Sequence, residues 1–179
     1  MLGDVHGMCM SAGTFFQTVG GQYSRALGMH EIALVCVLAL EGHDSLDVAK
    51  TRENMAIIYE KQGHYDQALE IYKSVLETKI RVCGHEHPDV AKSFINIGLV
   101  YAGKGDFENA LVQYQKGLEI QTRVFGSDHP DVAKSYNNIA NIYQTQGKYE
   151  EALDLYRKSL DIKTRIYGGD NHPNSSKRA

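Results

Sequence analysis

The apolar residues of this chain recur at helical spacing along most of its length. In segment 127–168, Ala133, Tyr136, Ala140 and Tyr143 follow one another at intervals of three or four. This spacing is typical of one face of an α-helix. After Gly147 a second stretch shows the same kind of spacing, at Tyr149, Ala152, Leu153, Tyr156 and Leu160. The segment therefore predicts two amphipathic helices joined by a glycine turn, and no sustained alternation predicts a strand.

This helix pair belongs to a repeat of 42 residues. Segment 127–168 aligns without a gap on 85–126, where 21 of the 42 positions are identical, and 43–84 follows the same register. A fixed period of this length is the signature of a stacked repeat protein. The sequence predicts five units: a degenerate N-terminal repeat or cap (1–42), three repeats (43–84, 85–126 and 127–168) and a polar tail (169–179).

Helix ends are marked by residues that recur in each repeat. Glycine takes the left-handed conformation at little cost, and it lies in the middle of the repeats at Gly63, Gly105 and Gly147. Proline suits the first helical position, and it stands at Pro88 and Pro130. Serine is a good N-cap, which predicts a capping role for the whole column of Ser45, His87 and His129. Basic side chains suit the last turn of a helix, as at Arg81, Arg123 and Arg165.

Several of these segments resemble the tetratricopeptide repeat (TPR), in the 42-residue form found in kinesin light chains. The matching segments are "HPDVAKS" at 87–93 and 129–135, "GKYEEALDLY" at 147–156 and "RIYG" at 165–168. The resemblance implies an all-α, right-handed superhelical solenoid of antiparallel helix pairs. It also implies that the first helix of each repeat lines a concave groove for partner peptides. In kinesin light chains the equivalent surface takes motifs with a tryptophan among acidic residues.

Composition narrows the classes of partner and compartment. The chain has 179 residues and a net charge of -3, whereas a general nucleic-acid binder normally carries a basic excess. The start lacks the pattern of a signal peptide, and the longest apolar run, 32–40, is too short to span a bilayer. We therefore expect a cytoplasmic or nuclear protein that binds neither nucleic acid nor membrane. Cys9, Cys36 and Cys83 are expected to be buried structural thiols.

No motif in the sequence indicates catalysis or a cofactor. It contains neither a phosphate-binding GxxxxGK[ST] loop nor the GxSxG and HExxH motifs of hydrolases and metalloproteases. His85 and His87 form an HxH pair, with His43, His129 and His172 at related places. Capping and loop packing are favoured over a metal site, because these histidines fall in the loops of successive repeats. We therefore expect no enzyme, no metal and no cofactor.

Two polar columns on the first helices are candidates for ligand recognition. Asparagine recurs at Asn54, Asn96 and Asn138, and lysine recurs four residues earlier, at Lys50, Lys92 and Lys134. This spacing places both columns on one helix face. Carboxamides offer donors and acceptors to a peptide backbone, and lysines attract acidic side chains. The predicted groove also includes Ile57, Ile95, Leu99 and Asn141.

Two interpretations of these columns remain open. In the first, the columns form a ladder that binds a partner peptide with acidic side chains, and the protein is an interaction scaffold. In the second, the asparagines bond neighbouring helices and fix the repeat spacing. A separate alternative for the whole protein is a structural or self-associating module. In that case an uncovered end repeat, after Gly168, packs on another copy as a weak homodimer.

Overall fold

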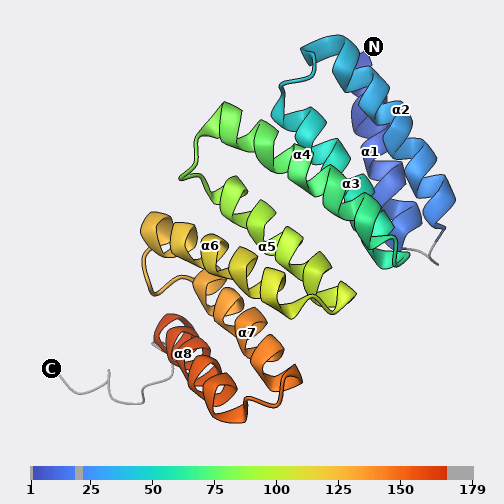
Figure 1. The fold of residues 1–179 in the computed structure, drawn as a ribbon. Helices are drawn as coiled ribbons and strands as arrows, with labels where there is room; N and C mark the ends of the chain where they lie inside the picture. The colour runs from blue at the N-terminus through green and yellow to red at the C-terminus, as the bar shows by residue number, and fades with distance from the viewer. Residues whose placement is uncertain (1, 19–21, 169–179) are drawn as a thin grey trace, which may run out of the picture.

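In the computed structural model, which describes residues 2–18 and 22–168, helices follow one another in antiparallel pairs (Figure 1). Each helix packs mainly on its neighbours in sequence, and the pairs stack in chain order. The described residues form eight helices and no strand, which confirms the all-α solenoid. The helices are α1 (Leu2–Thr18), α2 (Tyr23–Glu41), α3 (Leu46–Lys61), α4 (Tyr65–Cys83), α5 (Pro88–Lys104), α6 (Phe107–Phe125), α7 (Pro130–Thr145) and α8 (Tyr149–Tyr167).

The first helices of the repeats begin with the caps that the sequence predicts. The Ser45 hydroxyl accepts a hydrogen bond from the backbone N–H of Val48 at 3.1 Å. His87 and His129 take over this role through the ring nitrogen Nδ1, which accepts from the N–H two residues later at 3.2 and 3.1 Å. Pro88 and Pro130 open α5 and α7. The capping role expected for this column is confirmed at all three positions.

Glycines end the helices as the sequence predicts, with one exception. Gly63, Gly105 and Gly147 have φ values of 79°, 84° and 76°, a region that residues with a Cβ rarely adopt. Gly168 differs from the earlier closing glycines, because its φ is -84°. Gly21, the corresponding mid-repeat glycine of the N-terminal repeat, lies outside the described residues, as does the tail 169–179.

The arginines near the helix ends bind carboxylates rather than only facing helix carbonyls. Arg81 pairs with Asp44 at 3.2 Å and Arg165 pairs with Asp128 at 2.7 Å. Arg123 pairs in the same way with Glu86. Each pair joins the end of a repeat's second helix to the loop before its first helix. These pairs are exposed, so each contributes little to stability.

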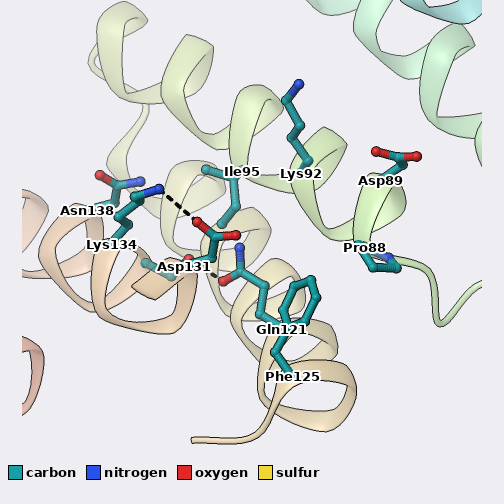
Figure 2. A pocket seen from close by; sticks show the side chains of 10 residues that line it. Pro88, Asp89, Lys92, Ile95, Gln121, Phe125, Asp131, Lys134 and Asn138 are labelled. Carbon is teal, nitrogen blue, oxygen red and sulfur yellow. Dashed lines mark hydrogen bonds and ion pairs between the residues drawn. The ribbon is translucent and has the colours of Figure 1, made fainter. Parts of the chain in front are cut away.

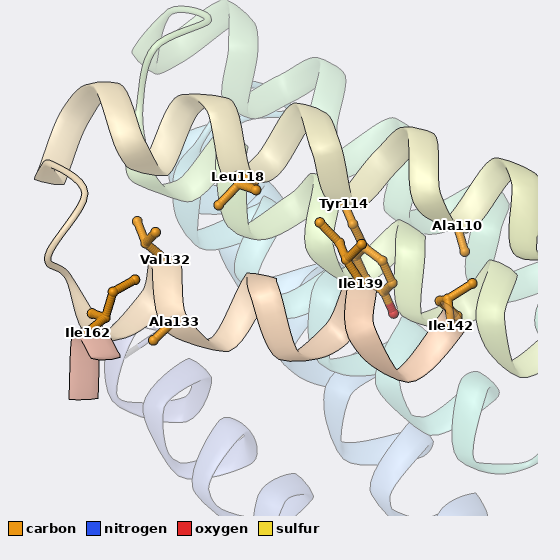
Figure 3. Close-up of a cluster of buried hydrophobic side chains, with 8 residues drawn as sticks. All are labelled: Ala110, Tyr114, Leu118, Val132, Ala133, Ile139, Ile142 and Ile162. Carbon is orange, nitrogen blue, oxygen red and sulfur yellow. The ribbon is translucent and has the colours of Figure 1, made fainter. Parts of the chain in front are cut away.

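The core lies between successive helix pairs. Figure 3 shows Tyr114 and Leu118 of α6 facing Ile139 and Ile142 of α7. Ala110 is fully buried and its side chain points toward Ile142, although its carbonyl lies beside Gly98 of α5. Ala110 therefore lies where α5, α6 and α7 meet.

The N-terminal repeat departs most from the others. Residues 2–18 form a continuous helix, and Gly13 lies against the buried ring of His30, which replaces the tyrosine of later repeats. By length and composition alone, α2 is apolar enough to cross a membrane. The core helix of a soluble protein and a signal sequence near the N-terminus pass the same test, and α2 packs on α1 and α3. Of the three cysteines expected to be buried, only Cys36 is; Cys9 and Cys83 are partly exposed free thiols.

Candidate binding groove between α5 and α7

Two hollows lie end to end between α5 and α7, with α6 beneath them. The first hollow has a volume of about 460 Å³, and the second has about 340 Å³. Asn138 lines both, so together they form one groove, here called the α5/α7 groove. The first hollow is lined by Pro88, Asp89, Lys92, Ile95, Gln121, Phe125, Asp131, Lys134, Ser135 and Asn138 (Figure 2). The second is lined by Leu99, Ala102, Phe107, Tyr114, Asn138, Asn141, Ile142 and Thr145.

Six of the ten predicted site residues line this groove. They are Lys92, Ile95, Leu99, Lys134, Asn138 and Asn141. Lys50, Asn54 and Ile57 lie on α3, outside the α5/α7 groove, and Ile57 packs against the core cluster around Tyr72. The remaining residue, Asn96, is on α5 but takes part in a different arrangement. The predicted lysine and asparagine columns therefore line a hollow only in part: Lys92, Lys134 and Asn138 do so, and the α3 residues and Asn96 do not line either hollow of this groove.

Asn96 binds a neighbouring helix through a buried carboxylate. Its side-chain amide donates a hydrogen bond to Glu53 Oε1 at 2.7 Å. The Lys79 ammonium binds the other oxygen of Glu53 at 3.0 Å, and Glu53 and Lys79 are only 5% and 4% exposed. Lys92 Nζ lies 3.8 Å from Glu53 Oε1. These contacts, here called the Glu53 clamp, join α3, α4 and α5. For Asn96 they match the spacing role, one of the two interpretations of the asparagine column.

The corresponding positions between α5 and α7 hold no clamp. Ile95 stands one repeat after Glu53, and Gln121 stands one repeat after Lys79. The side chain of Ile95 packs against Gly117. A Cβ added to this glycine would lie only 2.6 Å from Ile95 Cδ1. Gln121 Oε1 accepts a hydrogen bond from the Ser135 hydroxyl at 2.6 Å. Asn138 has no side-chain hydrogen bond within the described part of the chain. The gap that Glu53 fills in the preceding repeat is therefore open here.

Acidic residues partly balance the two lysines of the first hollow. Lys134 pairs with Asp131 at 2.8 Å, and this hydrogen bond and charge raise the pKa of the Lys134 ammonium. Lys92 is near Glu53, and Asp89 lies on the same wall. Lys134 is 70% exposed in its side chain, so its pairing with Asp131 is weak and exchangeable. The lysines can thus serve an incoming carboxylate only in competition with the chain's own carboxylates.

Other side chains fix the walls of the groove. The Phe125 and His129 rings stack with centroids 4.1 Å apart and planes at 14°, which holds Phe125 at one end of the first hollow. In the second hollow, the Tyr156 hydroxyl donates to Asn141 Oδ1 at 2.5 Å. The side-chain oxygen of Asn141 therefore already accepts a hydrogen bond from within the protein. Leu99 is 40% exposed and supplies apolar surface there.

The second helices also contribute to this groove, which the sequence did not predict. Gln121 and Phe125 come from α6, whereas the prediction considered only first helices. A signal was nevertheless present in the repeat alignment. The pair Glu53 and Lys79 changes together to Ile95 and Gln121 one repeat later, and a joint loss of opposite charges indicates a lost ion pair.

Comparison with known proteins identifies the repeat. The sequence profile of the tetratricopeptide repeat matches residues 16–81, 47–122 and 89–165. The chain belongs to the tetratricopeptide repeat family. This confirms the family inferred from the 42-residue period.

Solved TPR structures share the fold at low sequence identity. BtubC (BKLC) from P. vanneervenii has a TM-score of 0.82 at 23% identity, covering 97% of this chain and 68% of that chain. A putative kinesin light chain with nearly identical TPR-like repeats, from Podosopora anserina, has a TM-score of 0.71 at 20% identity, covering 93% and 76%. The apo form of RapI has a TM-score of 0.76 at 19% identity, covering 91% and 57%. No curated protein matches the sequence.

Proposed function

We propose that this TPR protein is an interaction scaffold that holds an extended partner segment in the α5/α7 groove. One observation carries the proposal: the groove stays open where the Glu53 clamp fills the gap between α3 and α5. TPR arrays generally serve as protein-interaction scaffolds, and the proposal adds where on this chain the partner binds.

The side chains of the groove suit a peptide with both apolar and acidic residues. The Asn138 carboxamide has donors and an acceptor for the peptide backbone. Ile95 and Phe125 supply apolar surface for a partner side chain, and Lys134 and Lys92 supply positive charge. Because both lysines are exposed, their attraction for an acidic peptide is screened by salt, with a Debye length of about 8 Å at physiological ionic strength.

Selection from a phage-displayed library of random peptides, followed by titration, tests this proposal. Peptides that bind the folded protein are labelled, and their affinity is measured by fluorescence anisotropy for the wild type, Asn138→Ala and Asn54→Ala. Loss of the Asn138 carboxamide should cost roughly 1–3 kcal/mol of binding free energy. Asn54→Ala removes the same group from α3 and should bind like the wild type. Equal affinity for all three proteins, each shown to be folded, would place the binding surface elsewhere.

Self-association is a second candidate function, and it is supported by the surface of α8. Leu160 is 62% exposed, whereas Leu118, one repeat earlier, is only 9% exposed beneath α7. Tyr149 and Leu153 of α8 are also exposed. Apolar surface of this kind often marks an interface. Sedimentation velocity tests the candidate: a sedimentation coefficient that rises with protein concentration supports a weak homodimer, and a constant monomer value contradicts it.

A further inference from the structure

We infer that copies of this chain stack head to tail, with α8 of one copy packed on α1 of the next copy. The inference rests on the second candidate function, self-association, because it names the surface that covers α8. The helix pair α1–α2 forms one end of the stack and α8 lies at the other end (Figure 1). These two ends present the two halves of a junction that the chain forms three times in its interior.

Inside the stack, each second helix packs on the first helix of the next repeat. The contacts of α2 with α3, of α4 with α5 and of α6 with α7 all have this form. At the α6–α7 junction, Tyr114 and Leu118 of α6 face Ile139 of α7 (Figure 3). The Ser135 hydroxyl of α7 donates a hydrogen bond to Gln121 Oε1 of α6 at 2.6 Å. One face of each second helix therefore fits one face of the first helix that follows it.

The C-terminal end of the stack presents the second-helix half of this junction. Tyr156 and Leu160 of α8 stand one repeat after Tyr114 and Leu118. The two α6 residues are buried against α7, whereas Tyr156 is partly exposed and Leu160 is exposed. The face of α8 that corresponds to the junction face of α6 is therefore open.

A shared contact aligns α1 with the first helices of later repeats. His30 of α2 stands two repeats before Tyr114 of α6. A Cβ added to Gly13 would lie 2.7 Å from the His30 ring, and a Cβ added to Gly98 of α5 would lie 2.6 Å from the Tyr114 ring. Gly13 of α1 is therefore the structural equivalent of Gly98, and this pair aligns α1 on α5 residue by residue.

On this alignment, α1 presents the first-helix half of the junction. Its residues Val5, Met8 and Phe15 correspond to Val90, Ser93 and Val100 of α5. The three α5 residues are buried, and Val100 packs in a core cluster with Leu69 and Tyr72 of α4. The three α1 residues are exposed: Met8 is 72% exposed, whereas Ser93 is 1% exposed. The face that holds α5 on α4 is thus apolar and open on α1.

Charge is also complementary between the two end faces. Lys163 of α8 stands one repeat after Gln121, and Asp4 is the only Asp, Glu, Lys or Arg in the sequence of α1. On the same alignment Asp4 corresponds to Asp131 of α7, which lines the same hollow as Gln121. Head-to-tail stacking therefore brings a lysine of one copy and an aspartate of the next copy to one hollow.

The proposed contact joins two different faces, which decides the kind of assembly. Such a heterologous contact leaves one α1 face and one α8 face open after each addition, so it builds an open chain. A contact between two α8 faces would instead be isologous and would stop at a dimer. Terminal repeats usually carry a polar outer face that prevents stacking, and neither end face of this stack is polar. Because association costs rigid-body freedom that the interior junctions do not pay, assembly should require high protein concentration.

Variants that block one end each test the stacking. Phe15→Glu places a carboxylate on the α1 face, and Leu160→Glu places one on the α8 face. Val35→Glu is the matched control, because Val35 is an exposed apolar residue of α2 that belongs to neither face. In sedimentation velocity, the wild type and Val35→Glu should form dimers, trimers and longer chains as concentration rises. Each end variant should associate about tenfold or more weakly, because burial of an unpaired charge is costly.

A mixture of the two end variants distinguishes stacking from other contacts. The intact α8 face of Phe15→Glu can pack on the intact α1 face of Leu160→Glu, so the mixture should form a 1:1 dimer and no longer species. Circular dichroism checks the fold of each variant. If Phe15→Glu is unfolded, Met8→Lys replaces it, because a lysine there would face Lys163 of the next copy.

Three results would overturn head-to-tail stacking. In the first, the α1 variant still dimerises alone while Leu160→Glu is monomeric, which retains self-association through α8 by an isologous contact. In the second, the two end variants remain monomeric when they are mixed. In the third, the wild type remains monomeric up to its solubility limit, which contradicts self-association as a whole.

Discussion

Replacing Glu53 with methionine should strongly destabilise the protein. Glu53 and Lys79 are 5% and 4% exposed, so their ion pair is sealed from water. Removing one partner leaves an uncompensated buried charge, which costs about 3–5 kcal/mol. Against a typical total stability of about 5–15 kcal/mol, this is a large fraction.

The double substitution Glu53→Met with Lys79→Met should recover most of that loss. Two unbranched apolar side chains of similar length fill the space, and replacing a buried ion pair in this way is often neutral or stabilising. Asn96 loses its acceptor but is partly exposed, so water can hydrate its amide. The double variant should therefore fall within about 1–2 kcal/mol of the wild type.

Urea unfolding followed by circular dichroism measures the three proteins at equilibrium. Asp128→Asn serves as a control, because it breaks the exposed pair with Arg165 and should cost no more than about 1 kcal/mol. The reasoning fails if Glu53→Met costs as little as the control. It also fails if the double variant is as unstable as the single one, since the loss would then come from packing and not from an unpaired charge.

Three further predictions concern the fold. Ala110→Leu should cost roughly 1–3 kcal/mol of unfolding free energy by overpacking the junction with Ile142, and an unchanged melting temperature would contradict the placement of this side chain. His129→Ala should cost roughly 0.5–2 kcal/mol because α7 loses its cap, whereas His129→Ser should keep most of the stability; equal urea midpoints for the two would show that capping is unimportant there. Burial lowers the pKa of His30, so the unfolded chain takes up a proton at this position first as the pH falls below about 6.5. Stability should therefore drop between about pH 7 and pH 5, and His30→Tyr should reduce that drop in melting temperature, because Gly13 leaves space as Gly98 does for Tyr114.

The sequence predicts the fold well because the signals for it are local. Each turn glycine, cap and apolar face acts within one helix or one turn, so Gly105 or Ser45 can be interpreted from its neighbours in sequence. Repetition then shows which of these signals matter. The prediction was less complete where a side chain binds one that is distant in sequence. Arg165 was placed correctly at a helix end, but its partner Asp128 lies 37 residues away.

The groove also depends on contacts between side chains that are distant in sequence. The helical period places the asparagines on one face, and only the joint change of Glu53 and Lys79 to Ile95 and Gln121 indicates that they differ in role. Asn96 and Asn138 occupy equivalent positions, and their difference comes from Glu53 and Ile95 on the preceding first helix. Such a difference depends on which side chains meet across a repeat boundary, and propensity and helical period contain no information about it.

The most direct measurement of the central claim is a nuclear magnetic resonance titration with a peptide selected on the folded protein. Binding in the α5/α7 groove predicts the largest shifts for the Ile95 methyl groups and for the side-chain amides of Gln121 and Asn138. The side-chain amide of Asn96 should change little, because Glu53 already holds it. Shifts confined to α8 or to the outer faces of the second helices, with Ile95 and Asn138 unchanged, would contradict the claim that this groove is the binding site.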